Sequence, residues 1–210
     1  MKIDVGVAVE ALAAGRVVGV PTQTLYGLAA RADDARAVER VFELKGRRPA
    51  LPSPCLVADA AAVRTLLKGP LEPRVLRLVD RFWPGALTVV VGGARDDLAP
   101  GLVGAGGTVG VRQDGDPTLA RVLRGLGVPV TGTSANRSGE PACRWGREVD
   151  ALFEGRLDYA GRLGDGPTMG GMASTVVRAD GASLVLLRDG ALDWPQISSA
   201  WEALRDVDDD

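Results

Sequence analysis

Hydroxyl groups follow the first apolar run of this sequence at the point where a strand is expected to end. Pro21 terminates the run 15–20, because proline cannot donate a hydrogen bond within a central strand. Thr22, Thr24 and Tyr26 come next. Open α/β sheets bind ligands at this carboxyl edge of their strands, so these residues predict ligand contacts. Taken alone, they also fit a turn whose hydroxyls cap backbone groups.

A second polar group follows the apolar segment 128–131. Ser134 and Asn136 come shortly after it, again where a buried strand is expected to end. Small hydroxyl and amide side chains can hold a ligand at such a place, or they can form an Asx or Ser/Thr turn. This segment by itself leaves both interpretations open.

Four cations stand at the ends of expected elements. Arg112 and Arg188 each follow an apolar strand directly, which indicates an anion site because the guanidinium fork matches carboxylate and phosphate groups. Lys45 and Arg47 stand where an amphipathic helix runs into a proline-rich passage. A loop there can turn both side chains inward. The alternative is a pair of solvated charges, which the C-terminal end of a helix favours.

Together these groups predict a pocket for a polyanionic ligand with no general base. The sequence contains no histidine, which excludes a Ser-His-Asp triad, a Cys-His pair and imidazole metal sites. Cys55 and Cys143 are far apart, so we expect small buried side chains and no redox or zinc motif. Phosphoryl or nucleotidyl transfer fits such a pocket, because positioning and charge neutralisation supply most of its catalysis.

Composition places the chain among ordinary globular proteins. It has 210 residues, 46% apolar and 25% charged, and a net charge of −2, so any basic site must be local. The first residues lack an apolar signal core, and no apolar run is long enough to span a membrane, so we expect a cytoplasmic protein. The length fits one domain over residues 1–200, and we expect the acidic tail 201–210 to fray.

Strand and helix signals alternate along the chain and predict a single three-layer α/β domain with a mixed sheet. The glycine-rich segment 161–171 is expected to be a mobile loop. The expected helices cover residues 4–14, 33–45, 59–67, 73–82 and 117–126, and the expected strands cover residues 15–20, 55–57, 87–91, 108–112, 128–131, 174–178 and 184–187.

The ordered set of motifs resembles the YrdC-like family, the L-threonylcarbamoyladenylate synthases of tRNA modification. The resemblance runs from about residue 15 to residue 192. Each motif is short, but their order and spacing make the set specific. The motifs are PTQTLYGL, LKGR, FWPGALTVVV, VGVR, TGTSANRSG, STVV and LLRDGAL.

This resemblance implies a twisted mixed sheet flanked by helices around a deep, positively charged cavity. It also implies that the chain makes threonylcarbamoyl-AMP and pyrophosphate from L-threonine, bicarbonate and ATP. Mg²⁺ would be carried by the nucleotide and held mainly by phosphate and water, with no organic cofactor. A separate threonylcarbamoyl transferase would use the product to modify tRNA next to the anticodon, so tRNA is expected to bind this chain only indirectly or weakly.

The resemblance also assigns roles to individual residues. It implies a catalytic tetrad made of Lys45, Arg47, Ser134 and Asn136. Arg112 is expected to hold the carboxylate of L-threonine, and the residues expected to contact that amino acid are Thr22, Thr24, Arg112, Ser134 and Ser174. The residues expected to contact ATP are Lys45, Arg47, Thr108, Asn136, Arg144 and Arg188. No protein ligand to a metal is implied.

Four positions depart from the family pattern. Leu51 stands where a lysine or asparagine is usual, and Leu56 takes a place that can be polar in relatives. Gln23 and Arg178 stand where acidic residues are common. These departures bear on the nucleotide contacts and leave the tetrad intact. The chain keeps the Lys-x-Arg pair that a non-synthase branch lacks, and it resembles the short form without an added C-terminal domain.

Two other functions fit a cavity of this kind. The first is a module that binds RNA or a nucleotide without turnover, which the negative net charge and the 4% aromatic content disfavour. The second is a carbamoyl-transfer domain that makes carbamoyl-AMP from carbamoyl phosphate, as in hydrogenase-maturation proteins. That domain normally lies within a longer multidomain chain.

Overall fold

The computed structural model describes residues 1–46, 52–156 and 158–204. Its first sheet has four strands in the order β8-β2-β1-β9. β1 pairs antiparallel with β2 and parallel with β9, and β2 pairs antiparallel with β8, so the sheet is mixed. The strands are β1 (Val17–Val20), β2 (Gly27–Ala29), β8 (Thr133–Ser134) and β9 (Tyr159–Arg162).

The second sheet has seven strands and is also mixed. Its order is β11-β10-β4-β6-β3-β7, with β5 paired to β6 outside this path. β4 is parallel to β10 and antiparallel to β6. The strands are β3 (Cys55–Leu56), β4 (Leu87–Val91), β5 (Val103–Gly104), β6 (Thr108–Arg112), β7 (Val130–Thr131), β10 (Thr175–Ala179) and β11 (Leu184–Arg188).

The two sheets are joined where the chain after β2 passes β7. Arg31 forms an isolated bridge with Val130, and the Thr131 amide donates to the Ala30 carbonyl oxygen at 2.8 Å. The Thr131 hydroxyl donates to the Leu28 carbonyl oxygen at 2.8 Å and accepts from the Ala30 amide at 3.1 Å. The predicted mixed sheet is therefore confirmed, but it is divided into two sheets linked by a few backbone bonds.

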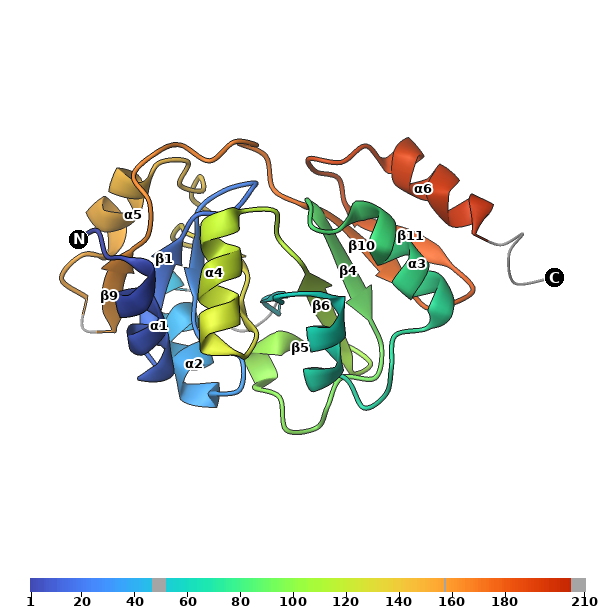
Figure 1. The fold of residues 1–210 in the computed structure, drawn as a ribbon, viewed down its shortest axis with the longest axis horizontal. Helices are drawn as coiled ribbons and strands as arrows, with labels where there is room; N and C mark the ends of the chain where they lie inside the picture. Colours follow the sequence, from blue (N-terminus) through green and yellow to red (C-terminus); the bar gives the residue numbers. More distant parts are fainter. Residues whose placement is uncertain (47–51, 157, 205–210) are drawn as a thin grey trace.

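Helices cover both sheets, as the α/β prediction requires (Figure 1). α1 packs against α4 and β1, α2 also contacts β1, and α5 contacts β9, whereas α3 packs on β4 and α6 packs on β11. The side chains of Asp4, Asp34 and Asp116 accept amide hydrogen bonds at the first turns of α1, α2 and α4, as N-caps do. The helices are α1 (Val5–Ala13), α2 (Ala35–Lys45), α3 (Pro73–Phe82), α4 (Pro117–Leu126), α5 (Gly146–Phe153) and α6 (Trp194–Ala203), with 3₁₀ turns η1 (Ala60–Thr65) and η2 (Pro100–Leu102).

Some predicted elements differ from the structure. The expected helix over 59–67 is a 3₁₀ segment over Ala60–Thr65. The tail expected to fray from residue 201 begins inside α6, because Trp201 is only 1% exposed and packs into the core below the Arg74 guanidinium. The glycine-rich segment 161–171 begins in β9. The strands β2, β5, β8 and β9 were missed because each is short and is fixed by pairing with another segment, and the helices α5 and α6 were also not predicted.

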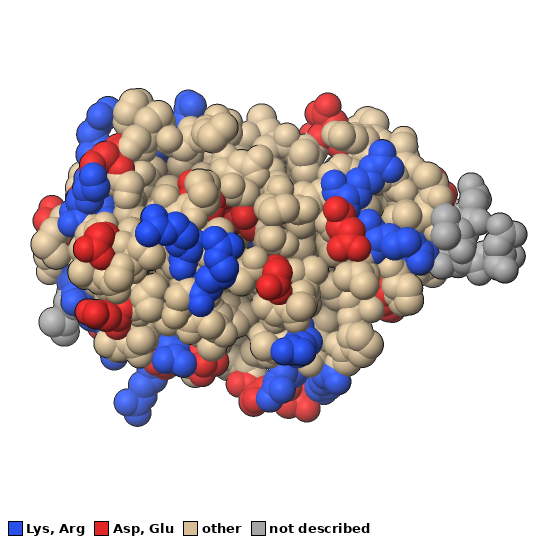
Figure 2. Space-filling view, in the orientation of Figure 1, with Lys and Arg blue, Asp and Glu red and all other residues tan. Residues whose placement is uncertain are grey.

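Charged side chains of both signs are interspersed on the face shown in Figure 2. This distribution agrees with the small net charge of −2. Within the described ranges, no helix is both long enough and apolar enough to cross a membrane.

Both cysteines are free and buried, as the sequence predicts. Burial raises the pKa of Cys55 to about 12 and, with help from Glu148, raises that of Cys143 to about 11. The nucleophile in thiol chemistry is the thiolate, so both groups are poorly reactive at neutral pH.

We therefore expect native protein at pH 8 to react with Ellman's reagent roughly 100-fold more slowly than protein unfolded in guanidinium chloride. A Cys143→Ser variant would report the reaction of Cys55 alone, and the difference between it and the parent protein would report Cys143. A fast native reaction at either thiol would contradict the burial of that side chain.

Candidate active site

A cavity of about 470 Å³ is lined by residues from both sheets. The four-stranded sheet contributes Ser134 of β8 and the loop after β1, and the seven-stranded sheet contributes residues of β4, β6 and β11. Among the residues predicted for the site, those that line this cavity are Thr22, Thr24, Thr108, Arg112, Ser134, Asn136, Ser174 and Arg188. The pattern of polar residues after strand ends thus led to one place in the fold.

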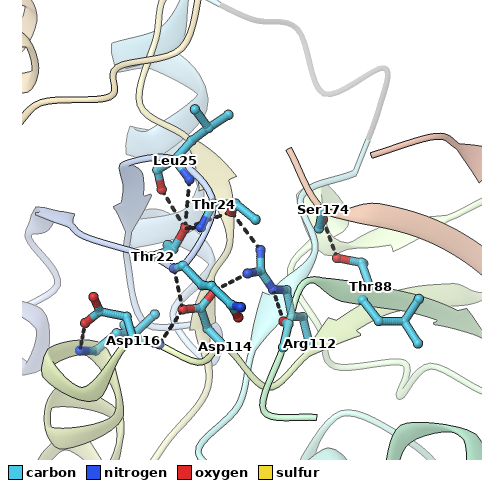
Figure 3. Close-up of polar contacts among 12 residues, drawn as sticks. Thr22, Thr24, Leu25, Thr88, Arg112, Asp114, Asp116 and Ser174 are labelled. Carbon is cyan, nitrogen blue, oxygen red and sulfur yellow. Dashed lines mark hydrogen bonds and ion pairs between the residues drawn. The ribbon is translucent and has the colours of Figure 1, made fainter. Parts of the chain in front are cut away.

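The loop after β1 is held by the Thr22 hydroxyl. Its single proton goes to the Leu25 carbonyl oxygen at 2.6 Å, and its oxygen accepts the amides of Thr24 and Leu25, each at 3.1 Å. The Thr22 and Thr24 hydroxyl oxygens are also 2.9 Å apart. The turn expected for these residues and a ligand contact are therefore compatible, since Thr22 closes the turn and Thr24 faces Arg112 (Figure 3).

Arg112 ends β6 and is only 5% exposed. Its Nε donates to the Gly85 carbonyl oxygen at 2.8 Å, its Nη1 donates to the Thr24 hydroxyl at 3.0 Å, and its Nη2 forms an ion pair with Asp114. Burial lowers the pKa of Arg112, and Asp114 opposes that shift. A guanidinium has five N–H groups. These three contacts therefore leave donors for a ligand in the cavity.

Ser174 lines the cavity, lies beside Thr88 (Figure 3) and also contacts Arg188. Its hydroxyl is 2.8 Å from that of Thr88, and Arg188 Nη2 donates to it at 3.1 Å and to the Ser174 carbonyl oxygen at 2.9 Å. Burial lowers the pKa of Arg188. A residue predicted on the nucleotide side thus touches one predicted on the threonine side, so the two predicted subsites adjoin here.

Three members of the predicted tetrad form one hydrogen-bonded group. Lys45 Nζ donates to the Asn136 Oδ1 at 2.7 Å, to the Asn136 carbonyl oxygen at 3.1 Å and to the Ser134 carbonyl oxygen. The Ser134 hydroxyl donates to Asn136 Oδ1 at 2.7 Å. For Lys45 the alternative of a solvated charge is wrong: the residue is 3% exposed, because its ammonium turns back into the segment 134–136. Arg47 lies outside the described residues.

The other predicted positions lie further away. Arg144 is exposed and is not among the residues that line the cavity; its guanidinium lies against Gly171. Leu56 does line the cavity. Arg178 is exposed on β10, and Leu51 lies outside the described residues.

The charged side chains of the described lining are Arg112, Arg188 and Glu140, an excess of one positive charge. A strongly basic cavity depends on Lys45 and Arg47 in addition, so the deep basic cavity stays a prediction. Sequence reasoning missed Thr88 and Asp114. Thr88 sits in an apolar strand, and Asp114 stands two residues after Arg112, where the pattern Arg-x-Asp at a strand end is a usable signal.

Comparison with known proteins places the chain in a family. A family model described as telomere recombination, for the Sua5, YciO and YrdC proteins, matches residues 10–190. A Bacillus subtilis protein named threonylcarbamoyl-AMP synthase is 35% identical over 192 residues, which is 91% of this chain and 55% of that protein. A Mycobacterium tuberculosis protein named putative threonylcarbamoyl-AMP synthase is 34% identical over 199 residues, 91% of this chain and 86% of that protein.

A solved structure gives the same result. The crystal structure of Sua5 from Pyrococcus abyssi complexed with L-threonine aligns with a TM-score of 0.87 and 31% identity, over 93% of this chain and 56% of that one. The chain therefore spans about half the length of the Bacillus protein and of this structure.

Proposed function

The chain belongs to the Sua5/YciO/YrdC family, and from this premise we propose that it is an L-threonylcarbamoyladenylate synthase. One observation carries the proposal furthest. Arg112 and Thr24 meet in a cavity, within a fold whose neighbour from P. abyssi binds L-threonine. Relatives named threonylcarbamoyl-AMP synthase support the same activity.

In this proposal the amino acid occupies the side of the cavity near Arg112. The N–H groups that Arg112 does not use within the protein bind the threonine carboxylate, a charge-assisted contact. The Thr24 hydroxyl oxygen accepts from Arg112 and lines the same part of the cavity. The hydroxyls of Ser174 and Thr88 complete this side.

The reaction then joins three substrates. The threonine amine forms an N–C bond with bicarbonate carbon, and water is lost to give the carbamate. A carbamate oxygen attacks the α-phosphorus of ATP, the bond from that phosphorus to the bridging oxygen breaks, and pyrophosphate leaves. Anions must be brought together while water is excluded, so fixed cations and N–H and O–H donors contribute more than a base does.

The triphosphate lies toward the tetrad in this proposal. Lys45, Ser134 and Asn136, with Arg47 and Arg188, neutralise and orient the phosphates, and Thr108 contributes a hydroxyl. Mg²⁺ enters with ATP and is held by phosphate oxygens and water. Within the described residues, no group of three His, Cys, Asp or Glu side chains is placed to hold a metal ion. MgATP is thus named as the substrate because Mg²⁺ is bound to the phosphates of ATP.

The product is a mixed anhydride, which a second enzyme must consume. A threonylcarbamoyl transferase that acts on tRNA is the reaction partner we propose, with the synthase itself in the cytoplasm. The tRNA need not touch this chain.

Pyrophosphate release tests the proposal directly. Purified protein with MgATP and bicarbonate should release pyrophosphate when L-threonine is added, and far less with no amino acid or with L-serine. The assay couples pyrophosphate to a phosphatase and a colour reaction, and mass spectrometry identifies threonylcarbamoyl-AMP.

The same assay separates the two alternatives. Binding of ATP or threonine without any release would indicate a non-catalytic binding member of the fold. Release that requires carbamoyl phosphate in place of threonine and bicarbonate would indicate a carbamoyl-transfer domain.

A further inference from the structure

Asp114 is a buried carboxylate that the predicted site does not include. It lies two residues beyond β6, and its side chain is 1% exposed. A carboxylate removed from water needs several donors to remain ionised. The groups that donate to Asp114 or pair with it come from separate parts of the fold, so its role is not limited to capping a local turn.

The two oxygens of Asp114 have different partners. Oδ1 accepts the amide of Gln23 at 2.9 Å and the amide of Asp116 at 2.8 Å. Oδ2 forms the ion pair with Arg112. Gln23 lies in the loop after β1 of the four-stranded sheet, whereas Arg112 ends β6 of the seven-stranded sheet. One side chain thus connects the two sheets beside the cavity (Figure 3).

Other hydrogen bonds hold the two segments that Asp114 connects. The loop with Gln23 is held on its other side by the amides of Gly170 and Gly171, which donate to the carbonyl oxygens of Gln23 (3.0 Å) and Thr24 (2.9 Å). Arg112 Nε is fixed on Gly85. With Nε and Nη2 both held, the plane of the planar guanidinium is set before any ligand arrives.

We propose that Asp114 is the positioning residue of the amino-acid subsite: it aligns the Arg112 guanidinium with the Thr24 hydroxyl by tying β6 to the loop after β1. The identity of the ligand, an α-amino acid with a free carboxylate, rests on the proposed function. A preorganised guanidinium raises the affinity for the ligand, because fewer side-chain conformations are lost when the ligand binds.

An amide cannot replace this carboxylate. Asp114→Asn keeps the shape of the side chain but has one acceptor oxygen and one NH₂ group. If the oxygen faces Gln23, the NH₂ faces Arg112 Nη2; if it faces Arg112, the NH₂ faces the two backbone amides. In either orientation the NH₂ group faces another N–H donor, so one of the two contacts that connect the sheets is lost.

The test uses Asp114→Asn and Asp114→Ala, with Asp116→Asn as the matched control. Asp116 caps α4 by accepting from Thr118 and Leu119, and asparagine is an equally good N-cap. Titration calorimetry should give both Asp114 variants an L-threonine Kd about 10-fold higher or more, with the ATP Kd within roughly 2-fold of the parent value. Asp116→Asn should change neither.

A second measurement does not depend on any ligand. In Asp114→Ala, hydrogen exchange of the Gln23 amide should quicken about 10-fold, since that amide loses its acceptor. Unchanged exchange overturns the proposal, and so does an unchanged threonine Kd in both variants. An equal loss of both ligands would indicate a general structural role and also overturn it. If the parent protein binds no threonine while exchange still quickens, the proposed function fails and the tie between the sheets is supported.

Discussion

Replacement of Arg112 by alanine should weaken L-threonine binding by roughly 30- to 1,000-fold, which corresponds to about 2–4 kcal/mol. The reason is that the buried guanidinium supplies the charge for the ligand carboxylate and also donates to Thr24 at 3.0 Å. ATP binding should change much less, because no phosphate contact is assigned to Arg112. Calorimetric titration of each ligand separately measures the two effects.

The structure adds a complication that the experiment must accommodate. Without Arg112, the buried Asp114 carboxylate loses its counter-charge, and an uncompensated buried charge destabilises the fold. Arg112→Lys retains a positive charge beside Asp114 but lacks the planar fork, so it should stay folded and still bind threonine more weakly. Arg121→Ala, at an exposed position of α4, is the control for the loss of an arginine.

The contrast between the two ligands decides the assignment. If Arg112→Lys, well folded by thermal melting, loses threonine and ATP affinity equally, Arg112 is not specific to the carboxylate. If it loses only ATP affinity, the two sides of the cavity have been assigned the wrong way round.

Local sequence pattern predicted much of this site. Proline or an arginine at the end of a β-branched run marks where a strand stops, and the polar residues after it are carried to the same edge of the fold. Thr24, Arg112 and Ser134 were found in this way, and all three line the cavity, as does Ser174, which only the family resemblance implied. These features are readable because each depends on a few adjacent residues.

What the sequence could not predict depends on partners far along the chain. β2 has three residues and β8 has two, and both are strands because of their partners: β2 pairs with β1 and β8, and β8 pairs with β2. Lys45 at the end of an amphipathic helix resembles a solvated charge. It is buried because carbonyl and amide oxygens about ninety residues later accept from it, a contact with no local signature.

Loss of the Lys45 ammonium should reduce turnover by about 100-fold or more, because it removes a fixed positive charge from beside the site where charge develops. Lys45 Nζ also holds the segment 134–136, whose Ser134 and Asn136 side chains line the cavity. Truncation therefore removes a positive charge and loosens two other members of the predicted tetrad together. Threonine-dependent pyrophosphate release under saturating MgATP measures the effect on kcat.

Lys45→Met is the better variant, because it retains the apolar stem of a side chain that is 3% exposed. Carbonyl oxygens left without a donor destabilise a fold by roughly 1–3 kcal/mol each, so a lower melting temperature is expected with it. Lys68→Met, at a side chain that is 55% exposed, controls for loss of a lysine as such. Rates must be compared well below the melting temperature of the variant. A folded Lys45→Met protein with the parent kcat would show that the tetrad has been placed on the wrong residues, since neither its charge nor its hold on segment 134–136 would then matter to the chemistry.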